Sequence, residues 1–278
     1  MSLPKAKGRM GFLFPVIRLA YRTDQQGFAE GGLFLEMQTQ HIMRSFDEEL
    51  KFLANQIAGM GGHAERMVEQ AVTALVNSDT GLAAKVIADD AFLDEKQREI
   101  DEKAVIIIAK RQPMAGDLRE IVGAIRISAD LERVGDLGKN IAKRVSAVSE
   151  TRQPVRLFRG LEALSDLALT QLKGVLDAYA TRSADKIALV RDRDEQIDAM
   201  YTSLFRELLT YMMEDPRNIT ACTQLLFCAK NIERIGDHAT NIAETVFHIV
   251  TGAQMPMERP KEDKSHRVTA EESESDRS

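Results

Sequence analysis

Apolar residues recur every three or four positions along most of the chain between residues 40 and 252, and no segment alternates with a period of two. This spacing places the apolar side chains along one face of an α-helix, whereas a half-buried β-strand requires the alternating pattern. The helix formers Ala, Leu, Glu, Lys, Arg, Gln and Met dominate the same region. The pattern therefore predicts an all-α protein.

The only prolines between residues 40 and 252 are Pro113, Pro154 and Pro216. Because proline breaks the interior of a helix, each one marks a boundary between two long helical segments. The sequence D-L-R-E that begins at Asp117 has the form of a capping box, and Asn218 is a second candidate N-cap. Six helices are thus predicted, three on each side of Pro154, at about residues 45–77, 82–111, 117–149, 157–180, 184–213 and 218–250.

The two halves of this region repeat each other. The segment from Ala129 to Val145 matches the segment from Lys230 to Val246 at an offset of 101 residues, and both contain E-R-[VI]-G-D. Upstream, D-A-F-L-D in the first half corresponds to D-E-Q-I-D in the second. Duplication of one helical unit explains both matches. We expect two tandem three-helix bundles, at residues 41–152 and 153–252.

The two ends of the chain differ from the helical region in composition. Residues 1–40 are basic, and their apolar stretch at 11–17 is broken by a proline, unlike the longer uninterrupted stretch of a secretory signal. We interpret them as a disordered leader or an upstream start, with the natural start at Met37 or Met43. Residues 253–278 end in the polar run E-E-S-E-S-D-R-S and are predicted to be a disordered tail.

Each half contains two pairs of acidic residues spaced four positions apart. Residues at this spacing lie on one face of a helix, with about 6 Å between their Cβ atoms. Counted from the predicted loops, the two pairs of each helical hairpin fall within about 3 Å of the same height along the helix axis. We therefore expect four carboxylates to meet in each half: Asp90, Asp94, Glu132 and Asp136 in the first, and Asp194, Asp198, Glu233 and Asp237 in the second.

Four clustered carboxylates repel one another, and a bound cation removes that repulsion. A site made only of oxygen ligands suits Mg, Ca, Mn or Fe, with Zn tolerated. One hypothesis is therefore a site for two or more metal ions in each hairpin. The alternative is a set of solvated acidic faces that pair with Arg133, Arg234 and their neighbours.

Two glycines and two asparagines lie close to the acidic pairs. Gly135 and Gly236 are within helices, where glycine costs about 1 kcal/mol relative to alanine, and they indicate a close approach between helices. Asn140 and Asn241 extend the acidic stripes by four residues. Their amides either hold the metal ligands through hydrogen bonds or make a polar contact between helices. His238 follows the second stripe directly in sequence and so points about 100° away from it.

Composition excludes several classes of function. The formal net charge is −6, aromatic residues make up 5 % and there is no Trp, which argues against a nucleic-acid partner. No apolar run is long enough to span a bilayer. Cys222 and Cys228 are six residues apart and face different directions on a helix, so neither a zinc site nor a redox pair is indicated, and a reducing cytoplasm is expected. No phosphate loop, Ser-His-Asp order or Cys-His arrangement indicates an enzyme.

Several motifs together resemble those of a known family. They are A-K-R-Q-P-x-A-x-D-L-R at 109–119, L-E-R-V-G-D at 131–136, N-I-E-R-I-G-D at 231–237, M-G-G at 60–62 and L-L-T-Y-M-M-E-D at 208–215. Over about residues 45–252 the chain resembles the PhoU family of accessory and regulatory proteins of the bacterial phosphate-specific transport system. The leader departs from that resemblance.

The resemblance implies two three-helix bundles related by a pseudo-twofold axis, with multinuclear metal clusters on the eight acidic residues, the metal being Fe, Zn, Mn or Mg. It also implies a cytoplasmic, homodimeric, non-enzymatic negative regulator of the phosphate (Pho) regulon. Such a regulator works with the ATPase subunit of the phosphate ABC transporter and a membrane sensor histidine kinase. Two alternatives stay open: a carboxylate-bridged multinuclear metalloenzyme, and a purely structural helical module.

Overall fold

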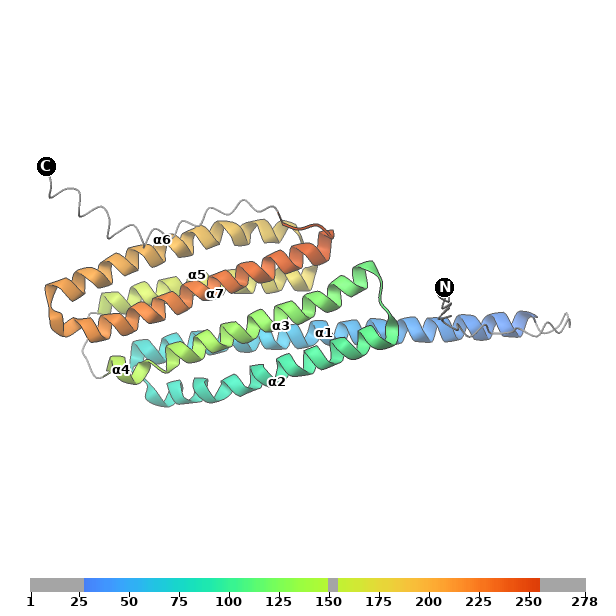
Figure 1. Cartoon of the computed structure of the whole chain (residues 1–278), viewed down its shortest axis with the longest axis horizontal. Helices are drawn as coiled ribbons and strands as arrows, with labels where there is room; N and C mark the ends of the chain where they lie inside the picture. Colours follow the sequence, from blue (N-terminus) through green and yellow to red (C-terminus); the bar gives the residue numbers. More distant parts are fainter. Residues whose placement is uncertain (1–27, 150–154, 256–278) are drawn as a thin grey trace, which may run out of the picture. The chain divides into compact units, whose positions relative to one another are not determined.

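The computed structural model describes residues 28–149 and 155–255, and within these ranges it contains helices and turns but no strand. The expected all-α class is confirmed. The elements, shown in Figure 1, are α1 (Phe28–Asn77), α2 (Thr80–Arg111), α3 (Ala115–Ala142), α4 (Val145–Ser149), α5 (Val155–Thr181), α6 (Asp185–Glu214), the 3-10 turn η1 (Pro216–Asn218) and α7 (Ile219–Thr251).

The chain divides into two compact units, residues 1–45 and residues 46–278. In the first unit the helix begins at Phe28, earlier than the expected start near residue 45, so the last part of the expected leader is helical. Residues 1–27 and 256–278, which include most of the expected leader and tail, lie outside the described residues.

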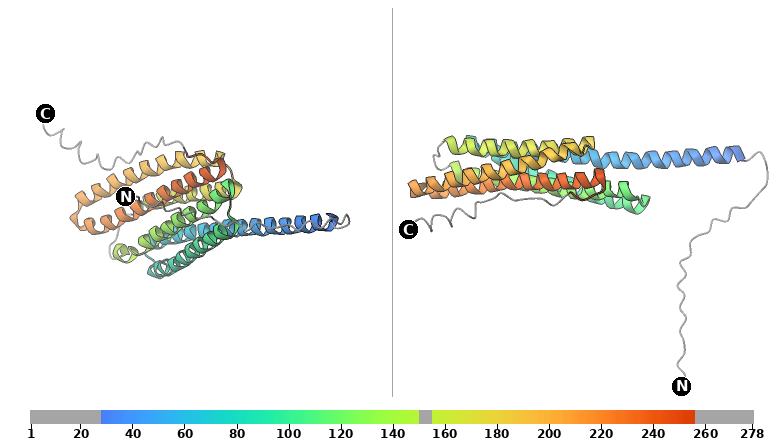
Figure 2. Two further views of the ribbon diagram at one scale, coloured as in Figure 1. Left: turned by 45° about the vertical axis from the view of Figure 1, so that its right-hand side comes forward. Right: turned by 90° about the horizontal axis from the view of Figure 1, so that it is seen from above.

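The second unit contains both three-helix halves. Its core consists of the apolar faces that the periodicity predicts, and Ile57, Leu93, Ile127 and Ile242 are among its fully buried side chains. Within each half, the second helix packs against the third: α2 against α3, and α6 against α7. Helices α3 and α7 also lie side by side and join the two halves, as Figure 1 and the left view of Figure 2 show. The helices that carry E-R-[VI]-G-D are therefore central in this unit.

Local signals predict most helix ends, but the two predicted N-caps, Asp117 and Asn218, need correction. Helix α2 is capped by Asp79, whose Oδ1 accepts a hydrogen bond from the Leu82 N–H at 2.9 Å. Asp117 is not an N-cap: the backbone already turns helical after Met114, which places Asp117 in the first turn. Asn218 does occupy the N-cap position of α7, but its side chain donates to the Tyr211 carbonyl instead.

The predicted third helix is also interrupted. A turn at residues 143–144 separates α3 from the short α4, whereas the sequence predicted one helix to residue 149. The apolar side chains Val145 and Val148 are nevertheless buried. The apolar positions therefore continue with helical spacing across the break. For this reason the sequence pattern did not reveal the break.

Candidate metal-binding clusters

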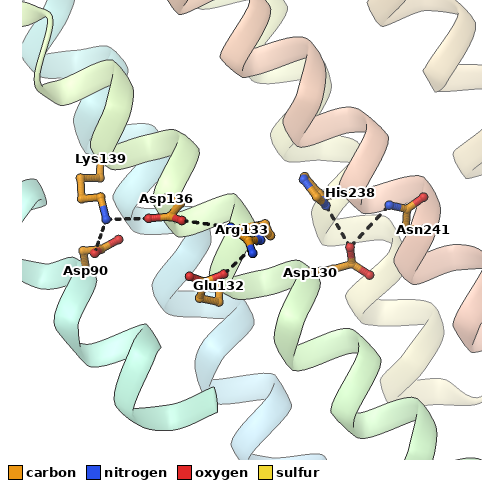
Figure 3. A network of polar contacts seen from close by, with 8 residues as sticks. All are labelled: Asp90, Asp130, Glu132, Arg133, Asp136, Lys139, His238 and Asn241. Carbon is orange, nitrogen blue, oxygen red and sulfur yellow. Dashed lines mark hydrogen bonds and ion pairs between the residues drawn. The ribbon is translucent and has the colours of Figure 1, made fainter. Parts of the chain in front are cut away.

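The first acidic cluster is organised around a lysine. Lys139 Nζ on α3 donates to Asp90 Oδ2 on α2 at 2.5 Å and to Asp136 Oδ1 at 2.6 Å (Figure 3). Both aspartates are thus within reach of a single cation, and α2 and α3 pair in the register that the sequence predicts. Asp90 is one of the few charged residues of the described chain that is buried, at 8 % exposure.

Glu132 completes the cluster from the same face of α3. Burial raises the pKa of Glu132 above its usual value, and the charges of Asp136, Asp94 and Asp90 raise it further. The four predicted carboxylates of the first half are therefore close enough to influence one another. Asp94 is the exposed member of the set.

Basic side chains compensate part of this negative charge. Burial would lower the pKa of the Lys139 ammonium, but its hydrogen bonds to Asp136 and Asp90 outweigh that effect and raise the pKa. Lys139 therefore stays charged at physiological pH. Arg133 lies 3.6 Å from Glu132 and 3.7 Å from Asp136, so the expected ion pairing with this arginine is also observed (Figure 3).

The second cluster is held by neutral groups at the equivalent position. Thr240, which is 101 residues after Lys139, donates from Oγ1 to Asp194 Oδ1 at 3.0 Å. Gln171 of α5 donates from Nε2 to Thr240 Oγ1 at 3.1 Å and to the Val190 carbonyl at 3.1 Å. Hydroxyl and amide dipoles here replace the ammonium of the first half.

The other members of the second cluster lie on α6 and α7. Glu233 is 4 % exposed, and its Oε1 accepts a hydrogen bond from Lys230 Nζ at 2.8 Å. Asp198 and Asp237 are half-buried, and each has contacts with other groups. The second hairpin therefore also buries part of its acidic stripe.

The close helix approach expected at the two glycines is observed. A Cβ atom added to Gly135 would collide with the Leu93 side chain of α2. A Cβ atom on Gly236 would lie 3.0 Å from Ile197 Cδ1 of α6 and 3.1 Å from Gln171 Oε1. Each glycine thus allows the second and third helices to pack tightly next to the acidic residues.

Asn241 and His238 make a different contact from the clusters. His238 Nδ1 lies 2.9 Å from Asp130 Oδ1, and Asn241 Nδ2 donates to the same oxygen at 3.5 Å (Figure 3). Asp130 is on α3, so these residues link the two halves. For Asn241, the polar contact between helices, one of its two expected roles, is thus observed. Asn140 is half-buried on α3.

The oxygen atoms of both clusters suit a hard cation. Asp90 and Asp136 already share one cationic nitrogen, and their carboxylate oxygens are of the type that divalent hard cations prefer. In the second half, Gln171 Oε1 is buried without a hydrogen-bond partner beside the Thr240–Asp194 contact. Within residues 28–149 and 155–255, no three Asp, Glu, His or Cys side chains already converge on one ion-sized point, so binding requires side chains to rotate away from their basic partners.

The sequence pattern did not identify four residues that organise these contacts: Asp130, Lys139, Gln171 and Thr240. The repeat offered one signal, since Lys139 and Thr240 are a mismatch within otherwise similar segments. Gln171 and Asp130 act across helices, and neither has a motif that would have singled it out.

Both cysteines are buried. Both Cys222 and Cys228 are free thiols inside the second unit. Burial raises the pKa of Cys222 and raises that of Cys228 to about 12. Because only the thiolate is a good nucleophile or metal ligand, neither residue is suited to that chemistry at neutral pH.

Comparison with known sequences now identifies the family. The sequence profile of the PhoU domain matches residues 57–145 and again residues 161–246, one match for each three-helix half. The chain belongs to the PhoU family. The resemblance seen in the motifs is thereby confirmed, and so is the duplication that the repeat predicts.

Two relatives align with this chain along almost their whole length. The phosphate-specific transport system accessory protein PhoU homolog of Rhizobium meliloti (strain 1021) is 68 % identical over 227 residues, covering 82 % of this chain and 96 % of the relative. The homolog of Caulobacter vibrioides (strain NA1000 / CB15N) is 49 % identical over 225 residues, covering 81 % and 98 %.

Solved PhoU structures share the fold. The crystal structure of PhoU from Pseudomonas aeruginosa matches with a TM-score of 0.70 at 37 % identity, covering 75 % of this chain and all of that one. The phosphate transport system regulatory protein PhoU from Streptococcus pneumoniae gives a TM-score of 0.70 at 29 % identity, covering 76 % and 100 %. In the described part of the present chain, no helix is long and apolar enough to cross a membrane.

Proposed function

We propose that this protein is an accessory and regulatory subunit of the phosphate-specific ABC transporter, and that it represses the Pho regulon when phosphate is plentiful. The observation that carries this proposal is the PhoU domain in both halves, together with an accessory-protein relative that is 68 % identical along 96 % of its length. The protein acts by binding partners and not by catalysis. Its partners are the transporter ATPase subunit and a membrane sensor histidine kinase, which it meets from the cytoplasm.

Exposed apolar side chains on α2 support a role in protein contacts. Phe92, Val105 and Ile106 are 43 %, 61 % and 42 % exposed. Helix α2 packs against α3 and still leaves these apolar groups exposed, and exposed apolar groups are suited to contact with a second protein. A homodimer and the transporter subunits are the proposed occupants.

Deleting the gene tests the regulatory function. The deletion strain should produce high alkaline-phosphatase activity in phosphate-rich medium, and the wild-type gene supplied in trans should restore repression. Phosphate uptake measured in the same strains reports on the accessory role. Unchanged phosphatase output together with unchanged uptake would overturn the proposal.

We further propose that the two acidic clusters bind metal ions, whose positive charge lets the carboxylates pack together. The ligands are the eight predicted residues: Asp90, Asp94, Glu132, Asp136, Asp194, Asp198, Glu233 and Asp237. The shared cation at Asp90 and Asp136 supports the first site, and the buried acceptor Gln171 Oε1 supports the second. A bound metal ion supplies charge neutralisation and holds the second and third helices of each half together.

Chelation tests this metal proposal. A ligand present at a hundredfold excess over its Kd stabilises a fold by about 2.7 kcal/mol, so removing the metal should lower the melting temperature measurably. Differential scanning calorimetry before and after dialysis against a chelator, with metal added back, measures the change. A melting temperature that does not respond to chelation or to added metal contradicts the proposal.

A further inference from the structure

A cavity of about 200 Å³ lies between the first turns of α3 and the last turns of α7. Its walls are largely apolar, with Leu118, Val122 and Ile249 among them, and three basic side chains border it: Arg119, Arg126 and His248. No carboxylate lines the cavity. It is thus a basic pocket with largely apolar walls, and none of its lining residues belongs to the acidic clusters.

The two arginines have unused hydrogen-bonding capacity. They are seven residues apart on α3, which places them on one face of the helix two turns apart. Within the described residues, neither guanidinium forms an ion pair with a carboxylate. The Nε atom of Arg119 is buried and has no hydrogen-bond partner. A buried donor of this kind is stabilised only when a ligand or water accepts its hydrogen bond.

The C-terminal end of α7 lies against the Arg119 side chain. Gly252 has a left-handed backbone (φ 74°), and a Cβ atom there would lie 3.4 Å from the Arg119 guanidinium carbon, so glycine leaves room for that side chain. His248 Nδ1 lies 3.2 Å from the Ala253 carbonyl oxygen. Because a carbonyl only accepts, Nδ1 carries a proton, and Nε2 is the nitrogen that stays available to a ligand.

The start of α3 adds to the positive potential. The cavity reaches Ala115, the first residue of the helix, and Met114 before it supplies no side-chain cap. The free N–H groups of a first turn carry partial positive charge. They therefore favour an anion at the same place as the arginines, although the two guanidinium groups are the stronger attraction.

We infer that this cavity binds an oxyanion of the phosphate class. Arginine pairs bidentately with phosphoryl oxygens, and such charge-assisted hydrogen bonds are stronger than those between neutral groups. The walls also accept an apolar group, so the ligand is either inorganic phosphate or a phosphoryl group on an organic carrier. The site itself follows from the cavity, and only the choice of phosphate over another oxyanion rests on the proposed function.

Calorimetric titration of the full-length, metal-free protein at low ionic strength tests the inference. The probes are inorganic phosphate and phenyl phosphate, with sulfate as a control for charge. Binding of inorganic phosphate alone assigns the site to free phosphate, and stronger binding of phenyl phosphate assigns it to a carried phosphoryl group. If neither probe binds at millimolar concentration, or if sulfate binds equally well, the inference is wrong.

Two variants locate the binding. Arg119→Gln and Arg126→Gln should each weaken binding about tenfold or more, because each removes a charge-assisted hydrogen-bond donor. Arg98→Gln is the matched control, since it removes the same charge from an exposed position on α2. Equal affinity of Arg126→Gln and the wild type would overturn the assignment.

A structural role for Arg119 is separable from ligand binding. If Arg119 only supports the end of α7, then Arg119→Gln lowers the melting temperature while Arg126→Gln, at an exposed position, binds phosphate like the wild type. The gene-deletion experiment does not use these variants, so the two tests are independent. Failure of phosphate binding thus leaves the regulatory proposal standing, and a deletion without phenotype leaves the binding site standing.

Discussion

Lys139 and Thr240 occupy equivalent positions in the two repeats, and each bonds to an aspartate of the neighbouring helix, Lys139 to Asp90 and Thr240 to Asp194. One repeat therefore places a fixed positive charge in its acidic cluster where the other places a neutral hydroxyl. Because this lysine competes with any metal ion for the oxygens of Asp90 and Asp136, it should weaken metal binding by the first cluster. In the second cluster a lysine, Lys230, pairs with Glu233 instead.

Replacing Lys139 by threonine, as in the second repeat, tests this competition. Lys139→Thr should raise the metal affinity of the first cluster and lower the free energy of unfolding of the metal-free protein by about 1–3 kcal/mol, since Asp90 and Asp136 lose their shared partner. Lys139→Arg retains the charge and is the control. Metal titration and chemical denaturation measure the two effects. A Lys139→Thr variant that binds metal no better than the wild type contradicts the prediction.

Glu132 tests the repulsion within the first cluster. Burial and three neighbouring carboxylates disfavour its charge. In metal-free protein, Glu132→Gln should therefore raise the free energy of unfolding at pH 7, by about 0.5–1 kcal/mol. The same variant should bind less metal because a ligand is lost. Glu95→Gln, at an exposed position on α2, is the control for a change of charge alone. Loss of stability in metal-free Glu132→Gln would show that repulsion is not the dominant effect.

The contact of Glu49 with the end of α2 predicts a pH dependence away from the clusters. Arg111 donates to Glu49 Oε2 at 2.9 Å, and this hydrogen bond holds the pKa of Glu49 below its usual value of 4.5. A lowered folded-state pKa stabilises the protein above the unfolded value, and the contribution is lost as the pH falls through the folded value. Glu49→Gln should thus lose about 1 kcal/mol at pH 7 and almost nothing once the pH lies below the lowered folded-state pKa of Glu49. A difference from the wild type that stays constant between these pH values would contradict the assignment.

The Asp130–His238 contact predicts coupling between the halves. Leu137 stands at the position in the first repeat that His238 occupies in the second, so His238→Leu copies one repeat into the other. The substitution leaves Asp130 at the α3–α7 interface without its partner at 2.9 Å and should cost about 1–2 kcal/mol. Combining it with Asp130→Leu should recover part of that loss. Strictly additive effects of the two substitutions would indicate that the contact contributes nothing.

The sequence predicts those features of this fold that depend on local periodicity. Helix α2 ends at Arg111 as expected, because Pro113 is a local signal, and the hairpin register follows from the loop positions. The same reasoning placed Asp90 and Asp136 together, which the shared contact with Lys139 confirms. Local patterns were sufficient wherever two adjacent helices are joined by a short loop.

The rest depends on contacts between distant parts of the chain. Gln171 reaches Thr240 from another helix, 69 residues away, and Asp130 meets His238 across the boundary between the halves. Neither pairing produces a periodic signal, since only the packing of α5 and α3 against α7 brings the partners together. The sequence analysis did not find the basic cavity for the same reason. Arg119 on α3 and His248 on α7 are far apart in the sequence, and only the fold brings them to one cavity.

Counting metal ions per chain tests most directly whether the repeated acidic clusters are cation sites. Mass spectrometry of metals in protein purified without chelator, and again after incubation with Mg, Mn, Fe or Zn, gives the stoichiometry. The wild type should retain bound metal, and two double variants should each lose part of it: Asp194→Asn with Glu233→Gln in the second cluster, and Asp90→Asn with Asp136→Asn in the first. Equal metal content in the wild type and both variants, or no bound metal under any of these conditions, would contradict the metal assignment and leave the acidic faces as ion-paired surfaces.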